Sequence, residues 1–250
     1  MNMVVATTST MAFLVKDSTE NGYNIDAKFK KIDIAMQMPQ ATIDFSSEKH
    51  DPDDIFSTIL GAVTDKPFGI TMSKTGKVTD VKNVETIWRT AMTPFKQLPE
   101  TEKEQIMNAY KGDALKGTIE MVTAIYPDKP VNKKDKWTIE TEFKSLMAAK
   151  VTTDYEFAEL TPDYALIKGY SKIKTTDKDA YTESSNGILT KYDLTGSMRS
   201  EIKVNKNTGW IIEAKIHQEI KGDTYIKESP QTLNRMKIPM TMINEIVIKN

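Results

Sequence analysis

The stretch ILTKYDLTGSMRSEIKV, residues 188–204, decides the fold because its polarity alternates residue by residue. The even positions are mostly apolar, as at Leu194, Met198 and Ile202, whereas the odd positions are charged or hydroxylated. Alternation with a period of two predicts a strand with one apolar and one wet face. The strand is far longer than the roughly 5–6 residues that are usual, so we expect it in a long, twisted sheet.

The next residues predict a β-meander. The sequence NKNTG at 205–209 has turn chemistry, and Gly209 suits a positive φ. A return strand repeats the alternation from Trp210 to Ile220. We expect a further hairpin at Gly222-Asp223 that leads to a strand at residues 224–227.

Similar patterns occur upstream. Residues 7–15 and 23–38 predict a hairpin of long strands, and the apolar positions of the second strand change parity near Lys30-Lys31. Such a change of face indicates a β-bulge. Three more strands are predicted at residues 136–143, 151–160 and 164–175.

Helical spacing appears between these β-rich segments. A short helix is predicted at residues 51–63, followed by a small hairpin at 68–81. A second helix is expected after Asn83 and should end near Thr93, because Pro94 cannot continue it. Two more are expected after Pro99 and from about Asp113, the last of which ends before Pro127.

These patterns predict one domain over residues 1–250, made of a β-rich part (1–81), a helical insert (82–126) and a β-meander (131–250). Each β-rich part alone would leave an apolar face open. The expected fold is α+β: a long antiparallel, strongly curved, half-barrel-like β-sheet with three or four helices packed on its apolar face.

The composition excludes several classes of function. Of 250 residues, 39% are hydrophobic and 28% are charged, which is typical of a folded globular protein. The net charge of −1 provides no basic footprint for nucleic acid. There are no cysteines and only two histidines, so disulfides, thiolate metal sites, a thiol nucleophile and three-histidine sites are excluded within one chain. No apolar run approaches the roughly 18 residues of a membrane span, and no cofactor is indicated.

The acidic stretch ATIDFSSEKHDPDDIF, residues 41–56, is the strongest candidate for a metal site. Asp44, Glu48 and Asp51 are weak candidate ligands, because the stretch lacks the glycine turn of calcium loops and contains Lys49. The favoured interpretation is structural: Asp51 or Asp53 caps the helix that follows, and Pro52 suits its first turn.

No catalytic residue is predicted. His50 and His217 have no serine or acid at a recognisable spacing, and His217 lies on the wet face of a strand. The chain also lacks the G-x-S-x-G elbow of many hydrolases. An enzyme such as a hydrolase is therefore the least favoured class.

Methionine is abundant, with 14 residues, and many of these lie on apolar faces. Methionine adapts to irregular gaps and to greasy ligands. Ordinary core packing is the default interpretation, and an apolar ligand cavity is the alternative. The candidate cavity residues are Met36, Met38, Trp88, Met92, Met107 and Met198.

Four segments carry a family resemblance: VKDSTENGYNIDAKFKKIDIAMQ with IDFSSEK, MSKTGKVTDVKNVETIW, KPVNKKDKWTIETEF, and GSMRSEIKVNKNTGWIIEAKIHQEI. They resemble an uncharacterised family of exported, often lipoprotein-like proteins of Bacteroidota, with a domain of unknown function. The resemblance implies a bacterial cell envelope location, periplasmic or lipid-anchored on the outer membrane, although no signal is present in this chain. Its motifs are structural, so it implies no site residue.

The leading expectation is a non-enzymatic envelope protein that binds or carries an apolar or lipid-like molecule between a curved sheet and helices. Lipoprotein carriers with a half-barrel and a helical lid offer an analogy at the level of fold. The alternative is a structural or protein-interaction module with a partner in the envelope.

Overall fold

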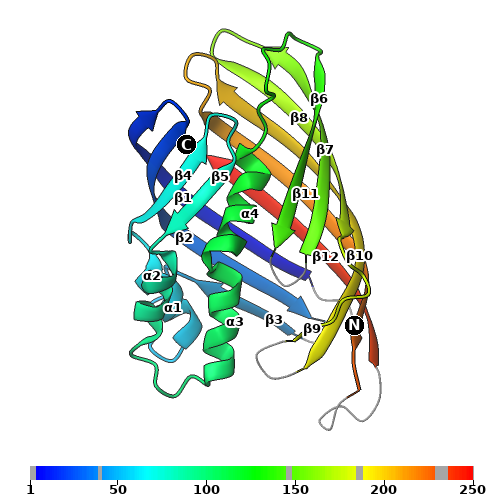
Figure 1. Ribbon diagram of the computed structural model, residues 1–250. Helices are drawn as coiled ribbons and strands as arrows, with labels where there is room; N and C mark the ends of the chain where they lie inside the picture. The colour runs from blue at the N-terminus through cyan, green and yellow to red at the C-terminus, as the bar shows by residue number, and fades with distance from the viewer. Residues whose placement is uncertain (1–3, 39–40, 145–147, 184–187, 229–235, 250) are drawn as a thin grey trace.

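The computed structural model describes residues 4–38, 41–144, 148–183, 188–228 and 236–249. Within them the chain is mostly antiparallel sheet with helices between two β-rich parts, as the sequence predicts (Figure 1). A five-stranded sheet contains β1 (Val4–Thr19), β2 (Gly22–Met38), β3 (Ala41–Ser46), β4 (Phe68–Ser73) and β5 (Val78–Lys82). Its order is β1-β2-β4-β5, and β3 also pairs with β2.

A seven-stranded sheet forms the other part. It contains β6 (Lys136–Lys144), β7 (Ala148–Leu160), β8 (Tyr164–Thr175), β9 (Thr182–Glu183), β10 (Leu189–Asn205), β11 (Ile211–Ile226) and β12 (Met236–Lys249). The order is β12-β11-β10-β8-β7-β6, and β9 pairs with β10. The long alternating stretch that decides the fold is therefore β10, near the centre of this sheet.

The helices are α1 (Ile55–Val63), α2 (Val84–Met92), α3 (Glu100–Tyr110) and α4 (Gly112–Thr123). α2 ends at Met92, two residues before Pro94, as predicted. Between α3 and α4, Lys111 adopts an extended conformation with ψ 160°, which separates the two helices. Asp54 caps α1 through a hydrogen bond from the backbone N–H of Ser57 (2.9 Å), so the prediction of Asp51 or Asp53 as the cap was wrong.

Two sequence predictions about the strands have opposite outcomes. The bulge near Lys30-Lys31 is confirmed, because Thr10 pairs with Lys31 whereas Met11 pairs with Phe29. The hairpin at Gly222-Asp223 is wrong, because β11 continues through both residues while pairing with β10 and β12. A Cβ at Gly222 would lie 2.1 Å from the carbonyl oxygen of Asp193, so this glycine marks a close approach between strands rather than a turn.

Two hydrophobic clusters form the core, and α4 contributes to both. The N-terminal cluster consists of residues from β2, β4, β5 and the helices, including Leu115 and Ile119 of α4. The C-terminal cluster consists of residues from β7, β8, β10 and β11, together with Val122 of α4 and Ile125 just beyond it. α4 therefore joins the two parts of the core.

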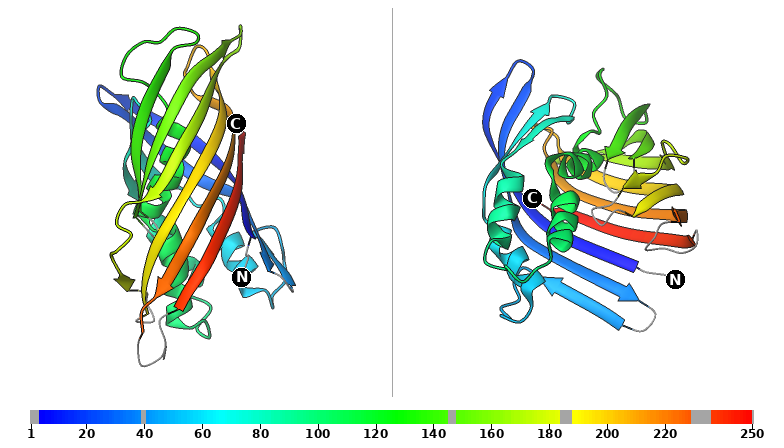
Figure 2. Two further views of the ribbon diagram at one scale, coloured as in Figure 1. Left: turned by 90° about the vertical axis from the view of Figure 1, so that its right-hand side faces the viewer. Right: turned by 60° about the horizontal axis from the view of Figure 1, so that its bottom comes forward.

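The two sheets are also neighbours at their edges. β1 lies beside β12, although they belong to separate hydrogen-bonded sheets (Figure 2). At the opposite edges, α4 lies between β5 and β6 (Figure 1). The ring of Tyr23 in β2 also packs on Trp210, with centroids 5.4 Å apart, and Tyr126 donates a hydrogen bond to the carbonyl oxygen of Gly209.

Candidate functional site

The predicted acidic stretch is a junction between β3 and α1. Its serines hold the junction: Ser47 exchanges hydrogen bonds with the backbone of Ile32 (2.8 and 2.9 Å), and Ser57 Oγ accepts from the N–H of Ser46 (3.0 Å). These contacts explain why the chain turns from strand to helix at this point.

The weak candidate ligands Asp44, Glu48 and Asp51 each have ordinary surroundings. Asp44 is exposed in β3, Glu48 forms an ion pair with Lys31, and Asp51 lies 3.9 Å from Lys49 while accepting a hydrogen bond from the N–H of Asp53. Among the residues that the structure describes, no group of three or more His, Asp or Glu side chains is arranged to hold a metal ion. The histidines are both exposed, and His217 pairs with Glu245 across the outer face of the sheet.

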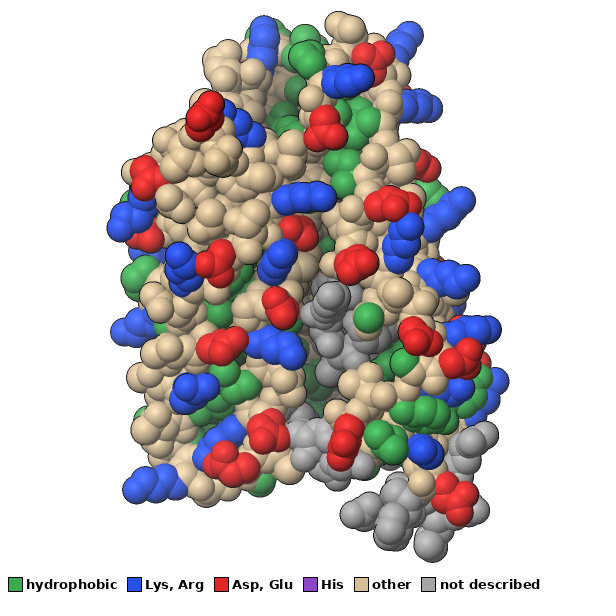
Figure 3. Space-filling model, viewed as in Figure 1, with side chains coloured by type: hydrophobic (Ala, Val, Ile, Leu, Met, Phe, Trp, Pro, Cys, Tyr) green, Lys and Arg blue, Asp and Glu red, His purple; other side chains and the backbone are tan. Residues whose placement is uncertain are grey.

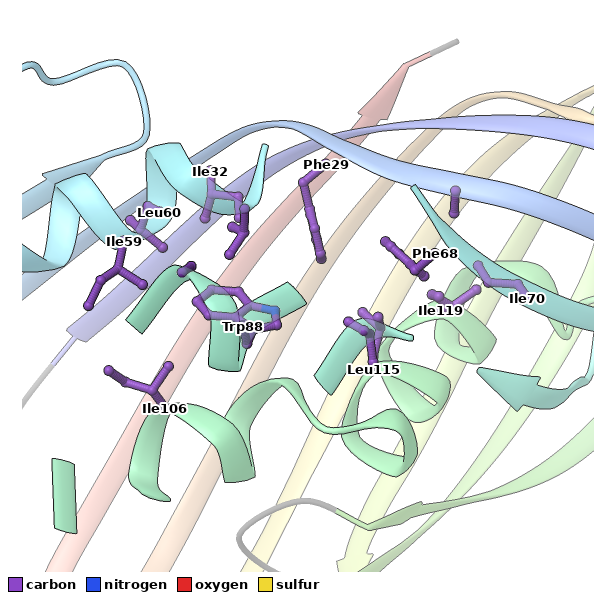
Figure 4. Packing of buried hydrophobic residues seen from close by; sticks show 14 of the residues in the cluster. Phe29, Ile32, Ile59, Leu60, Phe68, Ile70, Trp88, Ile106, Leu115 and Ile119 are labelled. Atoms are coloured by element: carbon purple, nitrogen blue, oxygen red, sulfur yellow. The ribbon is translucent and has the colours of Figure 1, made fainter. Parts of the chain in front are cut away.

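Most of the predicted cavity residues lie in or against the N-terminal cluster. Trp88 is fully buried, stacks on Tyr110 with centroids 3.9 Å apart, and lies among the aliphatic side chains of that cluster (Figure 4). Met92 is buried in the same cluster, and Met36 and Met107 pack against it half-buried. The side chain of Met38 lies outside the described residues. Of the five whose side chains are described, Met198 is the one in the C-terminal cluster.

A small pocket lies between α4 and the seven-stranded sheet, and Met198 lines it. We call it the α4–β6 pocket. Its enclosed space is about 10 Å³, room for roughly one water molecule, and the rest of the hollow is open to solvent. On this side of the molecule, charged side chains run along the middle of the surface, and apolar side chains gather between them near the upper end (Figure 3). The pocket is lined by Glu120, Met121, Ala124, Ile139, Thr141, Val151, Thr153, Tyr155 and Met198.

α4 is held over the pocket by contacts at its C-terminal end. Thr123 Oγ1 donates to the carbonyl oxygen of Gly76 in the β4–β5 turn (2.7 Å), and Gly76 has a φ of +82°. On the other side, Trp137 Nε1 of β6 donates to the carbonyl oxygen of Ile125 (2.9 Å). The helix is therefore attached to an edge strand of each sheet.

Gly169 in β8 makes room for the aromatic wall of the pocket. It pairs with Tyr155 on one side and with Ser200 on the other. A Cβ at this position would lie 2.7 Å from the ring of Tyr155 and 2.4 Å from Ser200 Oγ. The ring of Tyr155 fills this space and stacks on Trp137, with centroids 5.8 Å apart and an interplanar angle of 26°.

A row of directly paired residues crosses the sheet at the level of the pocket. Thr153 and Ser171 share a hydrogen bond between hydroxyls (2.8 Å), Asn244 Nδ2 donates to Gln218 Oε1 (2.7 Å), and Gln218 Nε2 lies 3.8 Å from the sulfur of Met121. These mutual contacts allow polar groups to be buried beside apolar ones. The row consists of Ile139, Thr153, Ser171, Met198, Gln218 and Asn244.

Glu120 is the one acidic side chain of the pocket lining. It is 9% exposed, and its Oε1 accepts a hydrogen bond from the backbone N–H of Val78 in the edge strand β5 (2.8 Å). Burial raises the pKa of Glu120, while the Val78 hydrogen bond and the charges of Lys116 and Lys77 partly oppose this shift. Burial also raises the pKa of Tyr155 to about 12, so its hydroxyl is neutral at ordinary pH.

Sequence reasoning missed most of this pocket because it followed methionines alone. The alternation of Val151, Thr153 and Tyr155 does place these three on one face of β7. Glu120 gave no such signal, because a single acid in a helix is usually exposed. Its proximity to Val78 depends on the docking of α4 against β5.

No described helix is both long enough and apolar enough to span a membrane. Comparison with curated proteins and with solved structures gives no match. A family model does match residues 20–211, which include all nine residues that line the α4–β6 pocket. Because that match spans most of the chain, the protein belongs to the family described as "Family of unknown function (DUF6263)".

Proposed function

We propose that the protein is a non-enzymatic component of the bacterial cell envelope that binds or carries an apolar, lipid-like molecule between α4 and the seven-stranded sheet. The observation that carries the proposal is the α4–β6 pocket. Met121 and Met198 face it from the helix and from the centre of the sheet, and Ile139, Val151 and Ala124 complete an apolar lining. Methionine-rich surfaces adapt to ligands of variable shape.

The size of the pocket limits what it holds. Ligand sites usually have about 300–1,000 Å³, whereas the space enclosed here is about 10 Å³. That is room for roughly one water molecule, so an alkyl segment would enter only where α4 and the edge strand β6 move apart.

The half-barrel arrangement belongs to the same proposal. In it, the two sheets form a strongly curved wall with the helices on its apolar face. Three observations support this arrangement: β1 lies beside β12, α4 lies between β5 and β6, and α4 contributes to both clusters. A wall of this kind would shield a ligand from water on the side away from α4.

The cellular location is inferred from the family resemblance. This resemblance implies an exported protein of Bacteroidota, periplasmic or lipid-anchored on the outer membrane. A carrier of apolar molecules has an evident use there, because such molecules cross an aqueous space only when they are shielded.

Native mass spectrometry of protein from its own host tests the proposal. We expect a bound apolar molecule in the wild type and its loss in Thr141→Trp, which places a large ring in the pocket from the half-exposed edge strand β6. Thr138→Trp on the outer face of the same strand is the matched control and should keep the ligand. A wild-type protein without ligand, or equal retention in both variants, would contradict the proposal.

A specific surface favours the alternative function, an interaction module. Residues 4–15 of β1 carry no charge, and Phe13, Leu14 and Val15 are 40%, 66% and 37% exposed. Val247 of the neighbouring β12 is 42% exposed. A photo-crosslinking residue at position 14 should then capture an envelope protein, whereas one at the charged outer position Arg199 should not.

A further inference from the structure

We propose that the outer face of the seven-stranded sheet binds an anionic saccharide chain through an exposed tyrosine and three neighbouring cations. We call this group the outer patch; it consists of Tyr170, Lys172 and Lys174 of β8 and Arg199 of β10. The outer patch lies on the opposite face of the sheet from the α4–β6 pocket, because the adjacent residues Ser171 and Met198 are buried inside. The inference therefore goes beyond the proposed function and is independent of it.

The strand pairing places the outer patch on one exposed surface. Tyr170 is 44% exposed and pairs directly with Arg199, so their Cβ atoms lie about 4.5–5.5 Å apart. Lys172 and Lys174 follow at alternate positions of the same strand, each about 7 Å further along. All four side chains are exposed, on the wall that β7, β8, β10 and β11 form side by side (Figure 2). A ligand can therefore contact the ring and the cations together.

The charge balance of this face gives the first argument. The acids around the outer patch have other partners; these contacts are Glu140–Lys150, Glu156–Lys136, Glu201–Lys168, Glu219–Lys221 and Asp154–Thr138. Within the described part of the chain, Lys172, Lys174 and Arg199 make no ion pair or hydrogen bond through their side chains. Lys150 also lies directly opposite Lys174, and like charges in this position repel. A bound anion would offset this excess of positive charge.

The side chains around the cations give the second argument. Tyr170 offers the face of an aromatic ring with a hydroxyl at its tip, and the C–H face of a pyranose ring packs on such a surface. Lys172 lies between Thr152 and Ser197, whose hydroxyls donate and accept hydrogen bonds. Arg199 and the lysines bind carboxylate, sulfate or phosphate groups through charge-assisted hydrogen bonds. A sugar chain with acidic substituents meets all three kinds of group.

Two other anionic partners fit this surface less well. β8 is paired with both β7 and β10, so its backbone groups are not available to an acidic peptide that adds as a strand. An anionic membrane would extend over the whole face and would also meet Asp154 and Glu201, which are both exposed. A narrow chain along residues 170–174 can leave both acids in water.

The test compares three probes by isothermal titration calorimetry at low ionic strength: hexagalacturonate, its methyl ester and hexaglutamate. The ester retains the sugar rings without the charges, and the peptide retains the charges without the rings. We expect hexagalacturonate to bind at least about fivefold more tightly than either, because it alone engages both the ring and the cations. Its affinity should fall as salt is added.

Two charge-matched double variants locate the site. Lys172→Gln with Lys174→Gln should weaken hexagalacturonate binding at least about fivefold. Lys136→Gln with Lys215→Gln removes the same charge from ion-paired lysines of the same face and should change the affinity less than about twofold. Tyr170→Ser should weaken the binding of hexagalacturonate but leave that of hexaglutamate unchanged.

The outcomes decide the proposal. Tightest binding of hexagalacturonate, with losses confined to the outer-patch variants, supports it. Absence of hexagalacturonate binding, equal or tighter binding of the ester or of hexaglutamate, or equal losses in the two double variants would contradict it. The proposed function is tested separately, because all of these variants lie on the other face of the sheet.

Discussion

At the scale of single residues, the carboxyl group of Glu120 has two different surroundings. Its carboxyl group accepts a hydrogen bond from Val78 at a sheet edge, and it also faces the α4–β6 pocket. The first role would be served equally well by a neutral acceptor. The lining of the pocket contains no Lys, Arg or His, and burial at this site makes the negative charge unfavourable.

The raised pKa of Glu120 predicts a pH dependence of stability. An acid whose pKa is higher in the folded than in the unfolded state binds its proton more tightly when folded. The free energy of unfolding therefore falls as the pH rises from the unfolded pKa through the folded pKa. Glu120→Gln removes this loss, so its stability relative to wild type should be greater at about pH 7 than at about pH 4.

Urea unfolding of both proteins at the two pH values measures this difference. The charges of Lys116 and Lys77 act on the carboxylate in the wild type only, and they reduce the expected difference. A relative stability that is the same at both pH values, or smaller near neutrality, would show that burial does not control this group.

Gly169→Ala tests the aromatic wall of the pocket. The added methyl group would overlap both Tyr155 and Ser200, so we expect a loss of about 1–3 kcal/mol in the free energy of unfolding. Gly112→Ala is the control, because its Cβ would meet the nearest atom at 3.5 Å and alanine favours a helix. Equal effects of the two changes in chemical denaturation would argue against the tight packing at Gly169.

At the scale of elements, the attachment of α4 to the β4–β5 turn decides whether the pocket exists. Gly76 and Gly209 both have a positive φ, of +82° and +74°. A Cβ at Gly76 would lie 1.7 Å from the carbonyl oxygen of Thr123, whereas a Cβ at Gly209 would have no atom within 4 Å. The two glycines therefore share the same conformational demand and differ in packing.

Alanine at either glycine should cost about 1–2 kcal/mol for the left-handed conformation. Gly76→Ala should cost at least about 1 kcal/mol more, because it also displaces the turn from α4. Thermal or urea unfolding of the two variants measures the gap. Equal losses would mean that the turn does not rest closely on the helix.

Elements whose signal is local could be predicted from the sequence. The alternation of β10, the bulge in β2 and the end of α2 before Pro94 each depend on neighbours in the chain, and each was predicted correctly. Gly222 was misread because a glycine in a turn and a glycine at a close strand contact look alike in sequence. The cap of α1 was misplaced among Asp51, Asp53 and Asp54, which are equally able to cap.

The pocket could not be predicted in the same way. Its lining comes from α4, β6, β7 and β10, and the docking of α4 brings these elements together. Of the six predicted residues, Met198 lines it because it lies on the apolar face of β10, whereas Trp88 and Met92 are buried in the N-terminal cluster. Composition identifies residues that suit an apolar site, but it does not show which of them face the same space.

At the scale of the whole molecule, the two sheets meet along β1 and β12 without forming one hydrogen-bonded sheet. Backbone groups of β1 that face β12 lack the ladder that protects the interior of a sheet. We therefore expect hydrogen–deuterium exchange to be faster in β1 than in β10, which has partners on both sides. Equal protection of β1 and β10 would show that the sheets are joined at this edge.

In the proposed function, an apolar ligand occupies the α4–β6 pocket rather than the region around Trp88. Methionine methyl NMR spectroscopy tests it most directly, because Met121 and Met198 line the pocket whereas Met92 is buried in the other cluster. On addition of hexanol, we expect shifts of the Met121 and Met198 resonances and none at Met92. Shifts at Met92 with Met121 and Met198 unchanged would contradict it.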